Sequence, residues 1–306
     1  MLYVIAGPTA SGKTAVAVAL AHMVKGEVVN ADSMQVYKGM DIGTAKPTLE
    51  ERGGIPHHVL DVASPGEPFS AARYKALAQE AIARIHQRGN VPILAGGTGF
   101  YINAVVYDTD FSGETGSGTA LRNQYTRLAM EKGGDYLHDL LSQRDAQAAA
   151  AIHPHNIKRV ARALAFCEST GTLFSAHNAQ QREKKHRDIP RDTVFVILDI
   201  PRDELYSRIN KRTEEMLAAG LEREVAGLLE AGFSPNLPAM QGIGYKQIAQ
   251  RATRPPILSQ IQQATRNYAK RQITWFKHNA PHARWIDASS GDAQAIAREI
   301  LHAKER

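Results

Sequence analysis

The chain begins with MLYVIAGPTASGKT, residues 1–14, which joins a short apolar run to a glycine-rich loop. Residues 2–6 are apolar and partly β-branched, a composition typical of a buried strand. Residues 7–14 read G-x-x-x-x-G-K-T, and residues 15–24, which contain neither Gly nor Pro, favour a helix. A strand, a glycine-rich loop and a helix in this order form the context in which the motif binds a polyphosphate.

The residues of this phosphate loop suit an anion. Gly7 and Gly12 allow backbone conformations in which several N–H groups point at one anion. The helix N-terminus adds a partial positive charge, Lys13 adds a full one, and the Thr14 hydroxyl suits a Mg²⁺ ion. A chance glycine turn is the alternative interpretation. The predicted diphosphate- or nucleotide-binding residues are Gly7, Pro8, Thr9, Ala10, Ser11, Gly12, Lys13 and Thr14, with Mg²⁺ as cofactor and Thr14 as its ligand.

Composition limits the class of protein. The 306 residues suffice for one large core, or for a main domain with a smaller insertion. Lys and Arg number 37 against 31 Asp and Glu, a surplus that permits a nucleic-acid partner without requiring one. The single cysteine, Cys167, excludes an intrachain disulfide and suits a reducing cytoplasm. The N-terminus runs directly into the phosphate loop, and no apolar run reaches the roughly 20 residues of a membrane helix, so we expect no signal peptide and no membrane partner. No obligate protein partner is evident.

Asp32 is the first candidate catalytic residue. It follows a predicted strand over residues 27–31, and the carboxyl ends of neighbouring strands share one crevice in doubly wound α/β folds. Asp32 should therefore lie on the same rim as the phosphate loop. A role as a helix cap or turn former is equally open. Beside a polyphosphate, a carboxylate can hold Mg²⁺ or act as a general base.

A second glycine-rich strand end follows at residues 96–101, GGTGFY, after a predicted buried strand over 91–95. An NTP-hydrolysing protein would be expected to place an Asp near this position. Asp199, after a predicted strand over 194–198, is the remaining candidate, although Pro201 and a helix follow it and helix capping is favoured. Shorter strands are expected at 57–62 and 285–286.

The composition changes from about residue 111. Residues 112–119 are rich in Gly, Ser and Thr, and about seventy residues with helical periodicity follow before the strand at 194. We therefore expect residues 112–190 to form a helical insertion and residues 1–111 with 191–306 to form the core domain. One inserted helix carries Lys158, Arg159 and Arg162, and residues 181–187 add a basic run. For this region alone, a solvated basic face is slightly favoured over a binding surface.

Arg212 lies on the apolar stripe of a predicted helix over residues 201–220, with Leu205, Ile209 and Met216. An arginine on an inward face should be paired or should bind an anion. An internal salt bridge and an anion clamp in the crevice are both open, and the clamp is favoured.

Two further segments suit an RNA. Residues 241–246, QGIGYK, form a glycine loop that also carries a cation and an aromatic residue, and the aromatic residue could stack on a base. A long helix is expected over 257–278, with Arg266, Lys270 and Lys277 opposite its apolar side and Arg271 between the two. Because no acidic residue occurs in that helix, an external polyanion is favoured over salt bridges.

Together these motifs resemble the bacterial tRNA dimethylallyltransferases. The resemblance rests on the phosphate loop, DSMQVY at 32–37, MDIGTAKP at 40–47, GGTGFY at 96–101, IHP at 152–154, KR at 158–159, GIGYK at 242–246 and YAKRQITWF at 268–276. The phosphate loop alone is common to many proteins, whereas the ordered set is specific. The resemblance implies a P-loop NTPase-like parallel sheet flanked by helices, with an all-helical insertion domain.

The resemblance also implies an activity. A dimethylallyl group would pass from dimethylallyl diphosphate to N6 of adenosine 37 in tRNAs that read codons beginning with U. Asp32 would be the general base, while Thr98 and Arg212 would contact the reacting groups. The implied tRNA contacts are Asp32, Ser33, Met34, Gln35, Lys158, Arg159, Arg162, Gln241, Gly242, Ile243, Gly244, Tyr245, Lys246, Lys270, Arg271 and Lys277, and the insertion would grip the anticodon stem. The alternatives are a small-molecule or nucleotide kinase and a non-catalytic RNA-binding NTPase.

Overall fold

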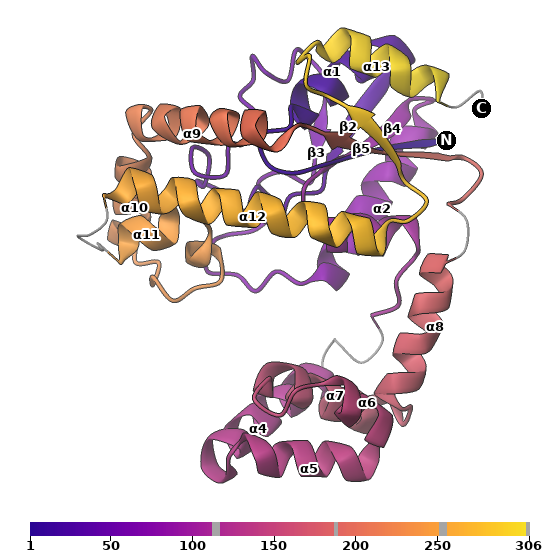
Figure 1. Cartoon of the computed structure of the whole chain (residues 1–306), viewed down its shortest axis with the longest axis vertical. Helices are drawn as coiled ribbons and strands as arrows, with labels where there is room; N and C mark the ends of the chain where they lie inside the picture. Colours follow the sequence, from indigo (N-terminus) through magenta and orange to yellow (C-terminus); the bar gives the residue numbers. More distant parts are fainter. Residues whose placement is uncertain (112–116, 187–188, 251–255, 304–306) are drawn as a thin grey trace. The chain divides into compact units, whose positions relative to one another are not determined.

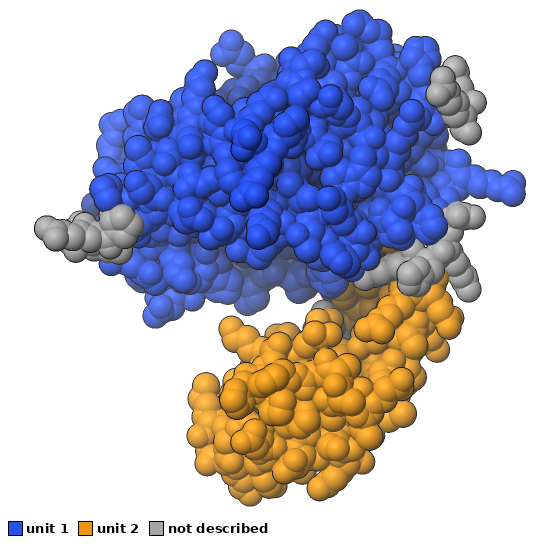
Figure 2. Space-filling view, viewed as in Figure 1, with its two compact units in different colours: residues 1–106, 188–306 blue, residues 107–187 orange. Residues whose placement is uncertain are grey.

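A computed structural model describes residues 1–111, 117–186, 189–250 and 256–303. The chain forms two compact units, one of residues 1–106 and 188–306 and one of residues 107–187 (Figure 2). Along the described residues, no helix has the length and apolar character needed to cross a lipid bilayer. The cytoplasmic location expected from the single cysteine stays a prediction.

A parallel six-stranded sheet forms the centre of the first unit (Figure 1). Its strands are β1 (Leu2–Ala6), β2 (Gly26–Asn30), β3 (His57–His58), β4 (Val91–Gly96), β5 (Thr193–Asp199) and β6 (Arg284–Asp287). They lie in the order β3-β2-β4-β1-β5-β6, so β1 is flanked by β4 and β5. The parallel α/β sheet predicted from the sequence is confirmed.

One predicted strand is much shorter than expected. Residues 57–62 contain only the two-residue strand β3, which pairs with Val28 and Val29 of β2. Val59 and Asp61 have φ values of 61° and 54°, and a strand cannot continue through this left-handed region. The apolar pattern alone did not contain that information.

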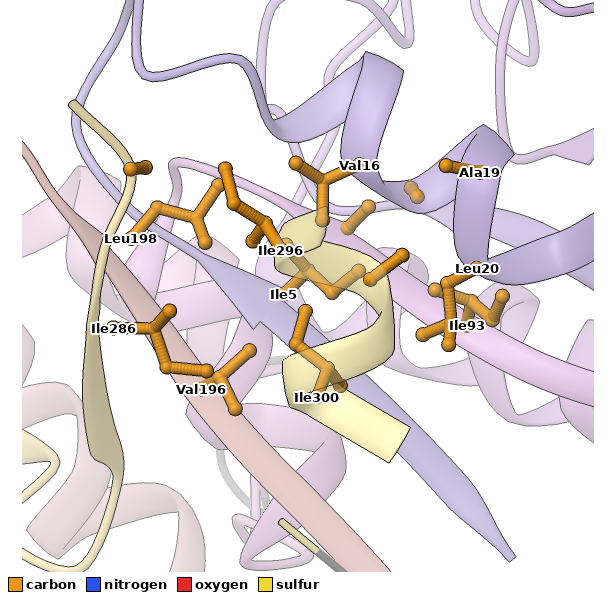
Figure 3. Close-up of a cluster of buried hydrophobic side chains, with 14 of the residues drawn as sticks. Ile5, Val16, Ala19, Leu20, Ile93, Val196, Leu198, Ile286, Ile296 and Ile300 are labelled. Carbon is orange, nitrogen blue, oxygen red and sulfur yellow. The ribbon is translucent and has the colours of Figure 1, made fainter. Parts of the chain in front are cut away.

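Helices cover both faces of the sheet in the first unit (Figure 1). They are α1 (Lys13–Val24), α2 (Ala71–Gln87), α3 (Gly99–Val106), α9 (Arg202–Ala218), α10 (Leu221–Glu230), the 3₁₀ turn η1 (Ala239–Gln241), α11 (Tyr245–Ala249), α12 (Ile257–Asn279) and α13 (Ala293–His302). In the core cluster, Ile296 and Ile300 of α13 lie against Val16 of α1 and against β1 and β5 (Figure 3). This apolar contact fixes α1, and with it the phosphate loop, on the sheet.

Every regular element in the described part of the second unit is a helix. Its helices are α4 (Ser117–Lys132), α5 (Gly134–Arg144), α6 (Ala146–Ala151), α7 (Ile157–Thr170) and α8 (Phe174–His186). Leu137 and Leu141 of α5 pack with Val160 and Leu164 of α7 in a core of its own. The all-helical insertion is confirmed. Most of the basic run 181–187 belongs to α8, and residue 187 lies outside the described residues.

The ends of β2 and β4 approach so closely that only glycine fits between them. A Cβ atom on Gly96 would lie 2.3 Å from the carbonyl carbon and oxygen of Ala31. The main chains are also joined there, because the Ala31 N–H donates to Ala95 and the Thr98 N–H donates to Ala31, at 2.8 and 3.0 Å. This contact brings Asp32 next to the end of β4.

We expect Gly96→Ala to lower the free energy of unfolding by about 1–3 kcal/mol, because the new methyl group meets backbone atoms that cannot move aside. Gly227→Ala, in α10, is the matched control, since a Cβ at Gly227 meets nothing within 4 Å. The control should gain about 0.5–1 kcal/mol from the stiffer backbone. Urea unfolding followed by circular dichroism measures both, and equal midpoints for the two variants would contradict the expectation.

Candidate functional site

The phosphate loop joins the central strand β1 to α1. Gly12 caps α1 with a φ of 81°, a conformation that favours glycine, and the first N–H groups of the helix follow it. The Lys13 ammonium folds back over the loop and donates to the Pro8 carbonyl at 2.6 Å and to the Ser11 hydroxyl at 3.5 Å. The loop is thus a preformed cradle with helix N–H groups and one ammonium.

Two cations share this part of the molecule. Burial and the nearby Arg212 lower the pKa of Lys13 to about 7, while Asp32 opposes that shift. Burial also lowers the pKa of Arg212, whose Nη1 lies 3.5 Å from the Thr9 hydroxyl. Among the described residues no carboxylate forms an ion pair with Arg212, so the salt-bridge interpretation is wrong. Two poorly compensated cations beside a phosphate loop favour a polyanionic ligand.

Asp32 forms a turn, as one of the two interpretations left open for it predicts, and its role as a base or metal ligand stays a prediction. Its Oδ1 accepts from the N–H groups of Met34 and Gln35, at 2.8 and 3.4 Å, and therefore shapes the turn. Its Oδ2 has no hydrogen-bond partner among the described residues. The buried Asn30 side chain holds the backbone of Asp32 by two hydrogen bonds. The Asp32 N–H donates to Asn30 Oδ1 at 3.0 Å, and Asn30 Nδ2 donates to the Asp32 carbonyl at 3.2 Å. One carboxylate oxygen is held and the other is available.

The glycines after β4 make room for α12. Cβ atoms at Gly97 and Gly99 would lie 2.3 Å from the Gln272 amide nitrogen and 2.0 Å from the Trp275 ring. The buried Gln272 joins two parts of the site, because its Oε1 accepts from the Thr9 N–H at 2.8 Å and its Nε2 donates to the Gly97 carbonyl at 2.9 Å. Sequence reasoning gave Gln272 no role, although it lies on the inward stripe of a helix, where a polar residue needs a partner.

Thr98 follows β4, and Asp199 is the last residue of β5. The Thr98 hydroxyl accepts from the Ser33 N–H at 2.9 Å and so holds the backbone next to Asp32. Its predicted contact with substrate stays a prediction. Asp199 is exposed and accepts from the Ile200 N–H at 3.1 Å, whereas Pro201 occupies the cap of α9. The predicted capping by Asp199 is therefore wrong, and Asp199 lines neither cavity described below.

Two neighbouring cavities lie at this edge of the sheet. The larger, of about 560 Å³, contains the phosphate-loop residues Gly12, Lys13 and Thr14. The smaller, of about 310 Å³, has apolar and aromatic walls that include Met216, Ile261, Tyr268 and residues 242–245. The residues that line both are Thr9, Ala10, Asp32, Thr44 and Arg212. Two chambers, one with the phosphate loop and one with Met216, Ile261 and Tyr268 in its wall, therefore meet at the carboxylate of Asp32 and the guanidinium of Arg212.

The glycine loop at 241–246 is locked in place by Glu224 of α10. One carboxylate oxygen of Glu224 accepts from the N–H groups of Asp41 and Ile42, at 2.9 and 2.7 Å, and the other accepts from that of Gly43 at 3.2 Å. The Tyr245 hydroxyl donates to the same carboxylate. The Tyr245 ring is fully buried and leaves room only for a glycine at position 43. The expectation that Tyr245 offers an exposed stacking surface is wrong.

Four of the other predicted tRNA contacts are exposed cations of the first unit. Lys246 of α11 and Lys270, Arg271 and Lys277 of α12 are exposed, and Arg271 also lines the smaller cavity. Arg266 instead donates to Asn210 at 2.7 Å, so it is not a free member of the predicted basic ridge.

Further members of the predicted set are close to the cavities or lie in the second unit. The Gln35 amide nitrogen donates to the carbonyls of Thr44 and Ala45, at 3.1 and 3.0 Å, so only its oxygen remains available. In the second unit, Lys158, Arg159 and Arg162 are exposed on α7, while Val160 and Leu164 of the same helix are buried. A role in tRNA binding stays a prediction for all of these residues.

Comparison with known proteins identifies relatives over nearly the whole chain. The model of the IPP transferase family matches residues 35–279. A tRNA dimethylallyltransferase of Desulfitobacterium hafniense is 42% identical over 304 residues, which are 98% of this chain and 96% of that protein. One from Geobacillus kaustophilus is 44% identical over 302 residues, with 97% and 94% covered.

Solved structures agree with the sequence relatives. The tRNA isopentenylpyrophosphate transferase of Staphylococcus epidermidis has a TM-score of 0.70 at 38% identity and covers 100% of this chain and 99% of that one. A eukaryotic dimethylallyltransferase seen acting on tRNA has a TM-score of 0.83 at 29% identity, with 98% and 77% covered. With a family model that matches most of its residues and with relatives above 40% identity along nearly its full length, this chain belongs to the IPP transferase family.

Proposed function

We propose that this chain transfers a dimethylallyl group from dimethylallyl diphosphate to N6 of adenosine 37 in tRNAs that read codons beginning with U. The observation that carries the proposal is the position of Asp32. This residue lines both the phosphate-loop cavity and the smaller cavity, and its Oδ2 has no hydrogen-bond partner among the described residues. Relatives named tRNA dimethylallyltransferase, and a structural neighbour that acts on tRNA, support the choice of substrates.

The chemistry requires an acid–base group and an anion site. The adenine N6 lone pair forms a bond to the allylic carbon, the bond from that carbon to the diphosphate oxygen breaks, and its electron pair leaves with the diphosphate. The N6 proton passes to Asp32 Oδ2, which has no hydrogen bond to give up. Lys13, Arg212 and the N–H groups at the start of α1 stabilise the negative charge on the leaving group. An allylic carbon with cationic character also requires that water be excluded, which suits a base inserted from a tRNA loop.

Mg²⁺ fits this site through Thr14. Within the described chain, no group of three or more His, Cys, Asp or Glu side chains is arranged to hold a metal ion. A site with few protein ligands suits Mg²⁺, which commonly keeps water molecules and substrate phosphate oxygens in its coordination shell. The Thr14 hydroxyl on the wall of the larger cavity would hold the ion, which when bound neutralises charge on the departing diphosphate.

The kinase alternative has less support from the site. A kinase would be expected to have an acid at the end of a strand beside the phosphate loop. Here glycines at the end of β4 allow close packing against Ala31 and Gln272, and the exposed Asp199 at the end of β5 lines neither cavity. The exposed cations of α12 also have no use in a small-molecule kinase. A non-catalytic RNA-binding NTPase would leave Asp32 Oδ2 without a purpose.

The second unit is the proposed grip on the anticodon stem. The exposed Lys158, Arg159 and Arg162 of α7 suit contacts with backbone phosphates, which position an RNA without reading its sequence. Lys270, Arg271 and Lys277 of α12 would form a second contact. Mass analysis of adenosines from a tRNA pool incubated with the enzyme, Mg²⁺ and dimethylallyl diphosphate tests the function directly. Incorporation of phosphate from ATP without any prenylated adenosine would reject it.

Asp32→Asn should lower the rate of prenyl transfer by at least about 100-fold while tRNA and donor affinities stay within about threefold. Asparagine keeps an oxygen for the Met34 and Gln35 N–H groups but has no carboxylate to take the proton. Single-turnover transfer and filter binding measure the two effects. A rate near that of the wild type would exclude Asp32 as the base.

Arg212→Ala should weaken binding of inorganic diphosphate by about 10- to 100-fold, since it removes a charged hydrogen-bond donor. Arg202→Ala is the matched control on the same helix, because Arg202 is exposed and lines neither cavity. Its guanidinium lies over the Tyr206 ring, 5.1 Å from the ring centroid, and its loss should change the affinity by less than about threefold. Equal losses in both variants, measured by calorimetry, would show that general charge and not the position of Arg212 matters.

Donor binding should depend on pH through Lys13. With a pKa of about 7, Lys13 is largely neutral at pH 8 in the free enzyme, and the diphosphate binds its protonated form. Affinity should therefore fall above pH 7 by up to about tenfold per unit, until the raised pKa of the complex is reached. Calorimetry of dimethylallyl diphosphate binding at pH 8, in two buffers of different ionisation enthalpy, should detect nearly one proton taken up. Lys13→Met should take up none, and the absence of uptake in the wild type would contradict the mechanism.

A further inference from the structure

Gln272 of α12 connects the phosphate loop to the chain that follows β4. The residue is buried, with 5% of its surface exposed, and it lines the larger cavity together with residues 12–14 of the phosphate loop. One end of its amide holds Thr9, the third residue of the loop, and the other end holds Gly97. It takes no part in the proton transfer or in the stabilisation of the leaving group described above.

The two partners determine the orientation of the Gln272 amide. The Thr9 N–H can only donate and the Gly97 carbonyl can only accept, so Oε1 faces Thr9 at 2.8 Å and Nε2 faces Gly97 at 2.9 Å. A reversed amide would oppose donor to donor and acceptor to acceptor. Position 272 therefore requires a side chain that has an acceptor and a donor side by side.

This contact fixes the spacing between the phosphate loop and the end of β4. A Cβ atom on Gly97 would lie 2.3 Å from Gln272 Nε2 and 3.4 Å from the Gly7 carbonyl oxygen, so the chain after β4 lies against the first residue of the loop. On the other side, the Thr9 hydroxyl lies 3.5 Å from Arg212 Nη1, and Thr9 lines both cavities. The Gln272 amide therefore holds the backbone of the loop residue that contacts Arg212.

The acceptor at position 272 also has to be uncharged. A diphosphate in the larger cavity brings negative charge into the chamber that Gln272 lines. A carboxylate could accept from the Thr9 N–H as well as an amide does, but it would repel the diphosphate and would oppose the Gly97 carbonyl with a second acceptor. An amide provides both hydrogen bonds without the charge.

We propose that Gln272 is a positioning residue for the diphosphate, and that its neutral amide holds the phosphate loop in the conformation that binds the donor. It acts through Thr9 and Gly97, because both ends of the amide are already bound to the chain. This inference rests on the proposed function, because it requires a diphosphate in the larger cavity.

Binding of inorganic diphosphate, measured by calorimetry, tests this role without catalysis. Methionine is similar in length to glutamine but cannot form the two hydrogen bonds. Gln272→Met should therefore raise the Kd for diphosphate about tenfold over that of the wild type at the same pH, both at pH 8 and at pH 5.5. Its Kd for tRNA, measured by filter binding, should stay within about threefold, because the exposed cations of α12 are unchanged.

Gln272→Glu separates the hydrogen bonds from the charge. At pH 8 its carboxylate should raise the Kd for diphosphate about 100-fold over that of the wild type. A protonated carboxyl group has the same pattern of one acceptor and one donor as an amide, and burial favours this neutral form. At pH 5.5 the Kd should therefore return to within about threefold of the wild type and fall below that of Gln272→Met.

Gln263→Glu is the matched control, because it introduces the same charge at an exposed position of α12 that lines neither cavity. Its diphosphate affinity should stay within about threefold of the wild type at both pH values. Thermal unfolding checks that all variants fold.

Three results would overturn the inference while the proposed function stands. The first is a folded Gln272→Met variant that binds diphosphate as the wild type does. The second is a Gln272→Glu variant whose affinity, relative to the wild type, does not recover at pH 5.5. The third is an equal loss of tRNA and diphosphate affinity in Gln272→Met, which would show that the residue only supports α12. A wild type that does not bind inorganic diphosphate would instead reject the proposed function, and this inference with it.

Discussion

The close approach of β2 and β4 is the constraint on which the site depends. Where Gly96 meets the Ala31 backbone, a Cβ atom would lie at 2.3 Å, so the two strands end side by side only because position 96 has no side chain. Asp32 follows immediately, and the Thr98 hydroxyl then holds the Ser33 N–H from the neighbouring strand. The Asp32 carboxylate thereby lies close enough to the phosphate loop to raise the pKa of Lys13.

The electrostatics of the site follow from that placement. Burial lowers the pKa of both Lys13 and Arg212, and Arg212 lowers the pKa of Lys13 further, while Asp32 raises both. A diphosphate relieves this repulsion when it binds. When it leaves as an anion during alkyl transfer, the same cations stabilise the charge that develops. The two half-buried cations, which are unfavourable together in the free enzyme, therefore stabilise the charge in the step that needs them.

Much of the fold is legible in the sequence because its signals are local. The apolar runs at 2–6, 91–95 and 194–198 are strands, and an arginine on an apolar stripe lies at the site as expected. Two of the misplaced or missed residues, Tyr245 and Gln272, make long-range contacts. Tyr245 in a glycine loop looks the same whether it is exposed or hydrogen-bonded to Glu224, twenty-one residues earlier. Gln272 connects segments 175 and 263 residues away, and no local pattern indicates that.

The phosphate loop itself fits a kinase as well as an alkyl transferase, so the distinction lies in what surrounds it. A kinase must leave its nucleotide phosphates accessible to an acceptor and supports its metal with an additional acid. Here the place of that acid is taken by glycines that admit α12 and Gln272, and α12 in turn brings Ile261 and Tyr268 to the second chamber. The glycines that stand where a kinase would have an acid are therefore also the residues that allow α12 to line the second chamber. An anion cradle on one side of Asp32 and an apolar wall on the other suit a reaction in which a diphosphate departs from an allylic carbon.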